Sequence, residues 1–509
     1  MQSEEKKRIA VNTAMLYIRM IIVMLVSLFT SRKVLEVLGV DDYGIYNVVG
    51  GVVSMLSFLN GSMTVATQRF LTYELGRNDL RQFRKVFSMA FGIHCILAVI
   101  VLILAETAGL WLVNTHLVIP EERLGAANWI YQTSVLVMLV SIVRTPYNAS
   151  IISHERMGIY AYVSVLEVVL KLLTVYLLVF LPYDKLAVYG VLGLAVQVAV
   201  ALIYFVYCRK NWPECRLLAF WDSRIFKDMA GFTGWNMFGT VAWILKDQGV
   251  NILMNMFSGP AVNAARGISI QVTGAVKNLV NGFQTAVNPQ ITKTYAADRR
   301  QEMHSLLCSS SKISFYLLLC IALPLGLEAP YILDLWLVDV PEYAVLFTRI
   351  ILLEVLLDTL SGPMITGLMA TGKIKWYQIV VGSILLLNIP VSYVLLRCGL
   401  PIYVPLAVSC TLTAAAIVAR QIFASRMLAL PLGRYARRVV LPVLAVAVLS
   451  PLVPYMIMSH IDTGFARLVI VTASAVAAVV WIAYLAGLDR REKDMVCGIV
   501  KNLVKRRKR

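Results

Sequence analysis

The feature that most constrains this chain is the recurrence of long apolar runs along its whole length. About 14 such runs, each of roughly 20 to 30 residues, are separated by short polar connections. A helix of about 20 apolar residues matches the hydrocarbon thickness of a bilayer. The 509-residue chain is 59% hydrophobic and only 15% charged, which is unlike a soluble domain. The sequence therefore predicts an all-α polytopic membrane protein with about 14 transmembrane helices.

The boundaries of the spans follow from the ends of the apolar runs. The predicted spans are roughly 9–31, 43–67, 86–112, 126–147, 159–181, 188–208, 229–256, 261–290, 305–327, 343–366, 376–396, 402–424, 439–458 and 465–487. The first run is too long for the core of a cleavable signal peptide. Eight cysteines without paired spacing indicate neither a disulfide framework nor a metal site, and no cofactor motif is present.

Basic residues gather on one side of the predicted membrane. They follow spans two, six, eight and twelve and fill the end of the chain, as at Arg84, Arg216, Arg299 and Arg437. About six basic residues lie on the opposite side, so the positive-inside rule predicts that both termini are cytoplasmic. The net charge of +18 is then explained by topology and by attraction to lipid headgroups, and not by binding of nucleic acid.

An internal repeat relates the two halves of the chain. Asn60-Gly61 and Thr72-Tyr73 near the end of span two correspond to Asn281-Gly282 and Thr294-Tyr295 in span eight. Both segments start on the same side and are six spans apart, which indicates a parallel repeat. The predicted domains are a six-helix lobe at 1–210, a cytoplasmic linker at 211–228, a second six-helix lobe at 229–425, and an extra helix pair with a basic tail at 426–509.

Span eight is both a membrane-length helix and a column of polar groups. Projected at about 100° per residue, one narrow face carries Arg266, Thr273, Lys277, Asn281, Gln284 and Asn288. A cation at a lipid-facing helix centre costs roughly 2.5 to 3.5 kcal/mol, so this face is expected to look into protein or water. Two interpretations stay open: helix–helix contacts made by amides, and one wall of a hydrated cationic pathway.

Three other spans carry polar faces that fit the second interpretation. Span seven places Asn236, Asp247 and Asn251 at spacings of eleven and four residues, and Lys246 adjoins Asp247. Span one has Arg19 near its middle, and span two ends at Arg69. We therefore expect a polar, substrate-binding interior lined by Arg19, Arg69, Asn236, Asp247, Asn251, Arg266, Lys277, Asn281 and Gln284.

Carboxylates inside two further spans are candidates for ion coupling. Span ten holds Glu354 and Asp358 one turn apart, an arrangement that suits carrying a proton or a sodium ion. A pair between Arg349 and Glu354 would instead make this a structural feature. Span five holds Glu167 and Lys171 at the spacing of a helical ion pair.

Several short motifs resemble one known family. They are Thr30-Ser31-Arg32, Leu38-Gly39, Tyr43-Gly44 and Tyr46 in the first loop, Pro146, His154-Glu155-Arg156 after span four, and Glu167 with Lys171. These resemble the bacterial polysaccharide repeat-unit (O-antigen or capsule) flippases of the multidrug/oligosaccharidyl-lipid/polysaccharide exporter superfamily. The resemblance covers about the first twelve spans and is strongest in the first five.

The resemblance implies a substrate and a mechanism. The substrate would be an undecaprenyl-pyrophosphate-linked oligosaccharide, moved from the cytoplasmic to the outer leaflet of the bacterial cytoplasmic membrane by alternating access of two lobes driven by an ion gradient. Its partners would be this lipid, membrane lipids and the polysaccharide polymerase machinery. Arg and Lys suit a pyrophosphate, whereas Asn, Gln and Thr suit sugars. Arg266 and Lys277 lie about 16 Å apart along a helix, so we expect successive stations, with Lys277 and Arg19 at mid-membrane.

Three other functions remain as alternatives. A drug or cation exporter of the same superfamily should have a cavity dominated by carboxylates and aromatic residues. A flippase for a peptidoglycan precursor would share the cationic cavity. A membrane glycosyltransferase would need a larger outer loop with a carboxylate cluster, which the sequence lacks, so an enzyme is not expected.

Overall fold

The computed structural model describes residues 2–115, 120–258, 260–337, 340–489 and 492–493. Every regular element in that part of the chain is helical, which confirms the predicted all-α class. The chain divides into two compact units, residues 8–237 and residues 238–509 with the first seven, and each is described by itself. This division reflects the density of contacts, so the domain limits proposed from the sequence stay predictions.

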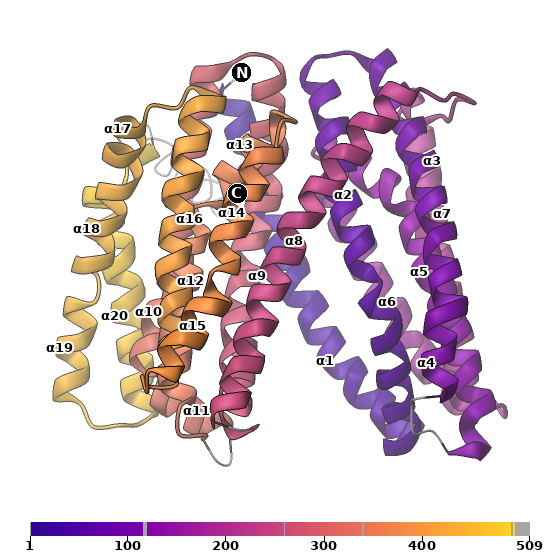
Figure 1. The fold of residues 1–509 in the computed structure, drawn as a ribbon, viewed down its shortest axis with the longest axis horizontal. Helices are drawn as coiled ribbons and strands as arrows, with labels where there is room; N and C mark the ends of the chain where they lie inside the picture. Colours follow the sequence, from indigo (N-terminus) through magenta and orange to yellow (C-terminus); the bar gives the residue numbers. More distant parts are fainter. Residues whose placement is uncertain (1, 116–119, 259, 338–339, 490–491, 494–509) are drawn as a thin grey trace, which may run out of the picture. The chain divides into compact units, whose positions relative to one another are not determined.

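The N-terminal unit contains six membrane-length helices or helix pairs that lie alongside one another (Figure 1). Its helices are α1 (Gln2–Met55), α2 (Ser57–Gly76), α3 (Leu80–Leu104), α4 (Leu110–Thr115), α5 (Leu124–Ser153), α6 (Met157–Phe180), α7 (Lys185–Asn211) and the start of α8 (Ser223–Ser258). One π-turn, η1 (Ala105–Gly109), joins α3 to α4. Gly39 interrupts α1 with φ 80° and ψ 171°, a conformation open almost only to glycine, and it lies between the first predicted span, 9–31, and the second, 43–67.

The C-terminal unit is a second bundle with an additional hairpin. It contains the rest of α8, α9 (Pro260–Ala296), α10 (Arg300–Leu327), α11 (Ala329–Trp336), α12 (Ala344–Thr359), α13 (Gly362–Ala370), α14 (Lys375–Leu386), α15 (Asn388–Arg397), α16 (Val404–Leu428), α17 (Leu432–Tyr435), α18 (Leu441–Leu449), α19 (Leu452–His460) and α20 (Phe465–Ile482). Two π-turns, η4 (Ala436–Val440) and η5 (Ala483–Gly487), flank the hairpin. Each predicted span corresponds to one helix or one kinked pair.

Four left-handed turns recur at matching places in the two halves of the chain. Asn78, Glu155, Asp298 and Gly372 have φ of 61°, 61°, 54° and 75°. They follow the second and fourth spans of each half, where a helix must reverse within a few residues. A left-handed residue at the helix end permits this reversal and lets the last carbonyls find partners. The repeated turn supports the parallel repeat. When the two halves are aligned on Asn78 and Asp298, Leu75 corresponds to Tyr295, whereas the sequence motifs aligned Tyr73 with Tyr295, a difference of two residues.

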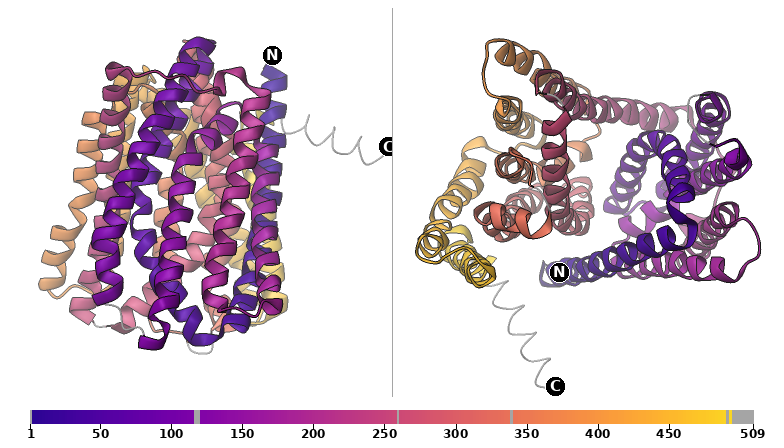
Figure 2. Two further views of the ribbon diagram at one scale, coloured as in Figure 1. Left: turned by 90° about the vertical axis from the view of Figure 1, so that its right-hand side faces the viewer. Right: turned by 90° about the horizontal axis from the view of Figure 1, so that it is seen from below.

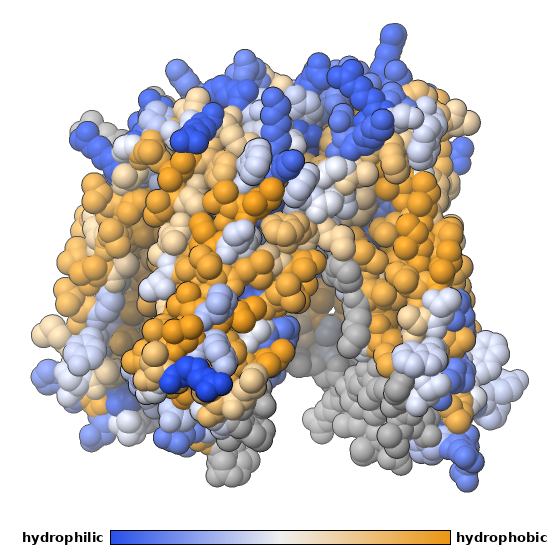
Figure 3. All heavy atoms as spheres, viewed as in Figure 1, coloured by the Kyte–Doolittle hydropathy of each residue, from blue (hydrophilic) through white to orange (hydrophobic). Residues whose placement is uncertain are grey.

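The surface of each unit is apolar along the middle of its helices and hydrophilic at their ends (Figure 3). Among the described residues, nine helical stretches are long and apolar enough to cross a membrane. Helices α8 and α9 are not among these nine because their charged and amide side chains lower the mean hydropathy. Their polar groups therefore have to be satisfied within the protein, which directs attention to the C-terminal unit.

The hairpin formed by α18, α19 and α20 is joined to α10 by two buried ion pairs. Arg467 at the start of α20 donates to Glu328, which follows α10, at 2.9 Å, and Glu328 is fully buried. Lys312 within α10 is also fully buried and donates to Glu492 at 2.7 Å. Figure 2 shows the hairpin running beside the rest of its unit. The extra helix pair predicted from the sequence is thus part of the C-terminal unit.

Candidate functional site

A cavity of about 310 Å³ lies inside the C-terminal unit among α8, α9, α12, α14 and α16. Its polar lining consists of Lys246, Asp247, Arg266, Thr273, Lys277, Glu354, Asp358, Ser409, Thr413 and Arg420. Its apolar lining includes Trp243, Val250, Ile270, Ile351, Val355, Leu385 and Leu406. This volume is near the lower end for small-molecule sites, large enough for a phosphate-sized group.

Helix α9 supplies one wall of the cavity. Arg266, Thr273 and Lys277 are spaced seven and four residues apart, so they share one face of the helix. The guanidinium of Arg266 donates to the Asp247 carboxylate at 2.5 Å and to the Asp247 carbonyl oxygen at 3.1 Å. Arg266 is buried, with 5% of its surface exposed. The polar stripe found in the sequence therefore faces the interior of its own unit at these three positions.

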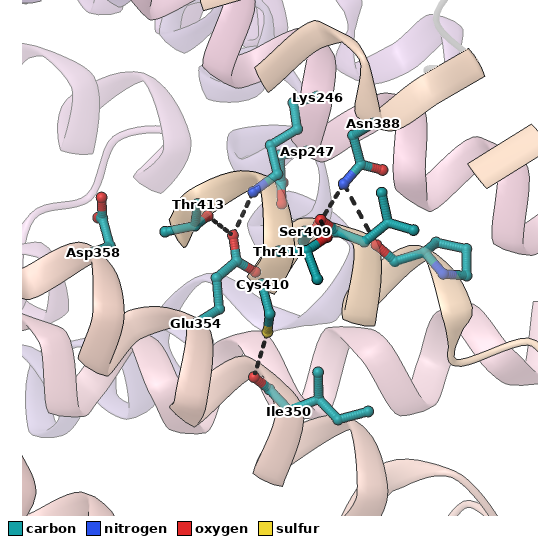
Figure 4. A network of polar contacts seen from close by, with 12 residues as sticks. Lys246, Asp247, Ile350, Glu354, Asp358, Asn388, Ser409, Cys410, Thr411 and Thr413 are labelled. Atoms are coloured by element: carbon teal, nitrogen blue, oxygen red, sulfur yellow. Dashed lines mark hydrogen bonds and ion pairs between the residues drawn. The ribbon is translucent and has the colours of Figure 1, made fainter. Parts of the chain in front are cut away.

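A second ion pair joins α8 to α12 (Figure 4). The Lys246 ammonium donates to the Glu354 carboxylate, and the Thr413 hydroxyl on α16 donates to the same oxygen at 3.3 Å. Lys246 is buried, whereas Glu354 is partly exposed. Because water reaches this pair only to a small extent, each of the two charges is stabilised mainly by the other.

A third carboxylate bridges two cations at the accessible end of the network. Asp358 accepts a hydrogen bond from Lys277 at 3.1 Å and lies 3.7 Å from the Arg420 guanidinium. The side chains of Lys277 and Asp358 are 38% and 35% exposed, whereas that of Arg420 is 8% exposed. Lys277 is consequently the basic group of the cavity that an incoming solute reaches most readily.

The cavity carries an excess of positive charge. Four basic side chains, Lys246, Arg266, Lys277 and Arg420, face three carboxylates, Asp247, Glu354 and Asp358. In a medium of low dielectric constant an uncompensated charge is costly, which favours either a bound anion or exchange of a proton. The cavity can thus hold an anionic group when that group takes the place of one carboxylate beside its basic partner.

The position of α16 in this site is fixed by a buried amide. Asn388, at the start of α15, donates to the Ser409 hydroxyl at 2.7 Å and to the Pro405 carbonyl at 3.4 Å (Figure 4). The Ser392 hydroxyl donates to the side-chain amide oxygen of Asn388 at 2.9 Å. Asn388 and Ser392 are fully buried. This network holds α15 against α16 and thereby positions Thr413 and Arg420.

The structure excludes one alternative for span ten, the pair between Arg349 and Glu354, and leaves ion coupling by Glu354 and Asp358 a prediction. Arg349 does not pair with Glu354, because its guanidinium donates to the carbonyl oxygens of Gly326 and Leu327 at 2.8 and 3.5 Å. Glu354 and Asp358 also do not act on each other as an isolated pair of carboxylates. Glu354 pairs with Lys246 of α8 and Asp358 with Lys277 of α9. The spacing within span ten could not identify these partners, because they come from other helices.

The remaining predicted site residues lie away from this cavity. In the C-terminal unit, Asn281 is exposed, Gln284 donates to the Ser314 hydroxyl and the Thr359 carbonyl, both at 3.5 Å, and Asn251 is half-buried. The N-terminal unit holds the other three. The Arg19 guanidinium stacks on the ring of Tyr160, Arg69 lies among the rings of Phe70, Tyr73 and Phe232, and Asn236 donates to the Ser62 carbonyl at 3.5 Å. The role of these six in a substrate path stays a prediction, as does a station shared by Lys277 and Arg19.

Sequence reasoning missed two basic residues of the cavity. Arg420 is the only Lys or Arg within the predicted span 402–424, and this placement could have identified it. Lys246 was noticed beside Asp247 but was not assigned to the site. Both side chains enter the cavity from helices other than α9, so the α9 periodicity carried no information about them.

The N-terminal unit has a polar cluster of its own around Glu167. Lys171 and Gln197 donate to the Glu167 carboxylate at 2.8 Å each, and Arg144 lies 3.6 Å from it. The predicted helical pair between Glu167 and Lys171 is therefore present. Arg144 was not anticipated from the sequence. Its guanidinium also lies over the ring of Tyr204, with 5.7 Å to the ring centroid.

The comparisons with known proteins agree with this architecture. The MatE family model matches residues 248–394, which include the end of α8 and all of α9 and α12. An outward-facing multidrug resistance MATE family transporter of the MOP superfamily is similar with a TM-score of 0.72 and 14% identity, covering 84% of this chain and 96% of that one. A comparison with curated protein sequences gives no match.

Two further solved structures are similar to a comparable degree. A MOP superfamily transporter from Pyrococcus furiosus, described as having a binding pocket of reverse polarity that suggests a different function, has a TM-score of 0.70 and 14% identity over 84% of this chain and 96% of that one. The MATE transporter ClbM in complex with Rb⁺ has a TM-score of 0.69 and 16% identity over 83% of this chain and 94% of that one.

These results define the class of the protein. It is a multi-pass α-helical membrane protein with the fold of the MATE transporters. Its segment 248–394 carries the sequence pattern of the MatE family, and this segment contributes Arg266, Lys277, Glu354 and Asp358 to the cavity.

Proposed function

We propose that the protein is a flippase for an undecaprenyl-pyrophosphate-linked oligosaccharide of surface polysaccharide biosynthesis. The observation that carries the proposal is the cavity of the C-terminal unit, in which four basic side chains face three carboxylates. Charge-assisted bonds from Arg and Lys are the strongest contacts that a protein offers to phosphate oxygens. The flippase-like motifs of the sequence supply the class of lipid substrate, and the fold supports a transporter.

The proposed binding step exchanges one anion for another. A phosphate entering at the accessible Lys277 would replace Asp358 as the partner of Lys277 and Arg420. The displaced Asp358 would then be an unpaired carboxylate in an apolar setting, which favours uptake of a proton. Substrate binding and proton uptake would therefore be linked through one residue. This keeps Asp358 as the leading candidate for ion coupling, with Glu354 held more firmly by Lys246 and Thr413.

An exporter of organic cations is the second candidate. Asp247, Glu354 and Asp358 all line the cavity, and Trp243 adds an aromatic surface on which a cation can lie. In this alternative the organic cation would displace Lys277 or Arg420 from Asp358. The similarity to a multidrug resistance transporter favours it. Both candidates use the same cavity, but they require ligands of opposite charge.

Ligand-dependent thermal stabilisation of the purified protein in detergent separates the two. A ligand that binds only the native state raises the unfolding temperature, and the rise grows with the logarithm of the ligand concentration above its dissociation constant. We expect undecaprenyl-pyrophosphate-linked saccharide to stabilise the wild type, and Lys277→Ala with Arg420→Gln to abolish this effect. Arg349→Gln is the matched control, because Arg349 is a cation of the same helix as Asp358 that does not line the cavity. Stabilisation by organic cations but not by the pyrophosphate lipid would overturn the flippase proposal.

A second experiment tests transport in cells of the source. Lys277→Ala should remove surface polysaccharide while the protein remains inserted in the membrane at normal abundance. Wild-type polysaccharide in the Lys277→Ala strain would exclude Lys277 from the path. Arg349→Gln, expressed at the same level, should leave the polysaccharide unchanged.

A further inference from the structure

A second cavity, of about 560 Å³, lies at the end of the C-terminal unit where the additional hairpin begins. It is lined by Gly433, Arg434, Arg437, Arg438 and Asp489. The first four residues belong to α17 and η4, and Asp489 follows η5. This is the side of the membrane that the distribution of basic residues predicts to be cytoplasmic. None of these residues belongs to the cavity proposed for transport.

The fold holds the three arginines together on one face. Arg434, Arg437 and Arg438 are spaced three and four residues from the first of them, as on one side of a helix. Tyr435 and Val439, on the opposite side, are buried, and the Tyr435 hydroxyl donates to the Leu360 carbonyl at 3.2 Å. The π-turn η4 contains two of the three arginines. Such turns change the direction in which side chains project and are frequent at functional sites.

The charge of this cluster is not compensated by neighbouring side chains. In the part of the chain that the structure describes, the exposed side chains of Arg434, Arg437 and Arg438 have no hydrogen-bond or ion-pair partner. By comparison, Arg300 at the start of α10 pairs with Asp298 at 2.8 Å. The one carboxylate of the cavity, Asp489, lies 3.9 Å from the Lys312 ammonium, so its charge is shared. The cavity therefore has the charge complementary to an anion.

An apolar surface continues from the cluster along the hairpin. Leu441, Leu444 and Val448 of α18 are exposed and follow Arg437 and Arg438 at three- and four-residue steps. They lie in a helical stretch, Leu432–His460, that is long and apolar enough to cross a membrane. A ligand that fits both features has an anionic head and long apolar chains. A free phosphate ion would use only the first.

We propose that Arg434, Arg437 and Arg438 form a binding site for the phosphate headgroup of an anionic phospholipid of the surrounding bilayer. Its acyl chains lie along Leu441, Leu444 and Val448. Basic pockets beside transmembrane helices are suited to such headgroups, because each Lys or Arg near an anionic membrane surface adds to the electrostatic attraction. The lipid joins the start of the hairpin to the membrane interface and neutralises a cluster of like charges. This inference does not depend on the transported substrate.

Native mass spectrometry of the full-length protein in detergent tests the site by titration with phosphatidylglycerol and, separately, with phosphatidylcholine. The test variant is Arg434→Gln with Arg437→Gln and Arg438→Gln. The matched control is Arg81→Gln with Arg224→Gln and Lys227→Gln, three exposed basic residues on the same predicted side of the membrane. A Lys version of the test variant retains the charge. Inorganic phosphate is added as a competitor.

We expect the wild type to bind phosphatidylglycerol in preference to phosphatidylcholine. The Gln test variant should lose affinity by on the order of a hundredfold, while the control stays within about twofold and the Lys variant keeps most of the binding. Equal loss in the test and control variants, or no loss in the test variant, would overturn the proposal. Full displacement of the lipid by inorganic phosphate at an equal concentration would show a site for a free anion instead, and would also overturn it.

Discussion

The carboxylate of Asp358 on α12 accepts a hydrogen bond from the ammonium of Lys277 on α9 at 3.1 Å. Because Asp358 also lies 3.7 Å from Arg420 on α16, a single carboxylate connects three helices of the C-terminal unit. The side chains of Lys277 and Asp358 are also partly exposed, at 38% and 35%, so this ion pair is in contact with solvent. The following predictions concern this network and the contacts that hold it in place.

Replacing Asp358 by Asn should destabilise the protein by about 1 to 3 kcal/mol. The change leaves Arg420, which is nearly buried, without its carboxylate, and an unpaired buried charge is more costly than an absent pair. The partial exposure of Asp358 and Lys277 limits the effect. Thermal unfolding in detergent measures it. The double variant Asp358→Asn with Arg420→Gln removes the unpaired cation and should recover part of the loss. No recovery would show that the charge of Arg420 is not the cause of the destabilisation.

The pair between Lys246 and Glu354 should show strong coupling in a double-mutant cycle. Lys246→Met alone leaves the Glu354 carboxylate with only Thr413 and should cost about 3 kcal/mol. Glu354→Gln alone should have a similar effect, because it leaves the buried Lys246 without a counter-charge. The combination of both changes should be less destabilising than their sum. Additive effects in the cycle would contradict the ion pair.

Glu328→Gln should loosen the attachment of α20 to α10. The change removes the negative charge that Arg467 contacts, at a position that is fully buried. Hydrogen exchange measured by mass spectrometry should rise in residues 465–482 and stay unchanged in α5, which belongs to the other unit. Glu328→Leu with Arg467→Leu replaces the pair by apolar contacts and should restore protection. Unchanged exchange in Glu328→Gln would show that the hairpin is held by apolar packing alone.

Asp184 should contribute stability that is lost in acid. Partial burial raises the pKa of Asp184, but the Ala187 amide, which it caps, and the Arg123 guanidinium outweigh this effect and hold the pKa below its usual value of 3.8. Since the folded state has the lower pKa, the stabilisation is complete at neutral pH and disappears as the pH falls below about 4.

Asp184→Asn keeps a capping oxygen but cannot titrate, so it provides a direct check. Thermal unfolding of the wild type and the variant should differ at pH 7 and converge as the pH is lowered. Arg123 also pairs with Asp42 in the same unit, and both proteins keep Asp42, so the comparison isolates the effect of Asp184. A constant difference between the two proteins across this range would contradict the assignment to Asp184.

Hydropathy and helical periodicity predicted the fold and part of the site. Span limits are set by the length of apolar runs, so each predicted span has a helical counterpart. The face of α9 that carries Arg266 and Lys277 was predicted because side chains three, four and seven residues apart must share a side of a helix. The left-handed turns at Asn78 and Asp298 were not predicted, because neither residue type requires that conformation.

The partners of the charged residues could not be predicted from one sequence. Periodicity states which side chains share a face but not which helix lies opposite. Lys277 and Asp358 are 81 residues apart in the sequence, and their side chains meet only because α9 packs beside α12. For the same reason Glu354 was associated with its neighbour Arg349 and not with the distant Lys246. The packing of helices against one another determines these ion pairs, and the spacing of residues within one helix does not predict that packing.

The burial of Lys312 has a consequence for how this protein could be shortened or evolve. Its ammonium, in the middle of α10, pairs with the Glu492 carboxylate and donates to the Gly487 carbonyl, and both of these residues follow α16 in the sequence. Trimming the chain after α16 would strand a cation in the interior of the remaining bundle. A smaller ancestor or a minimal engineered version would therefore need an apolar residue at position 312 before the last two spans could be dispensed with.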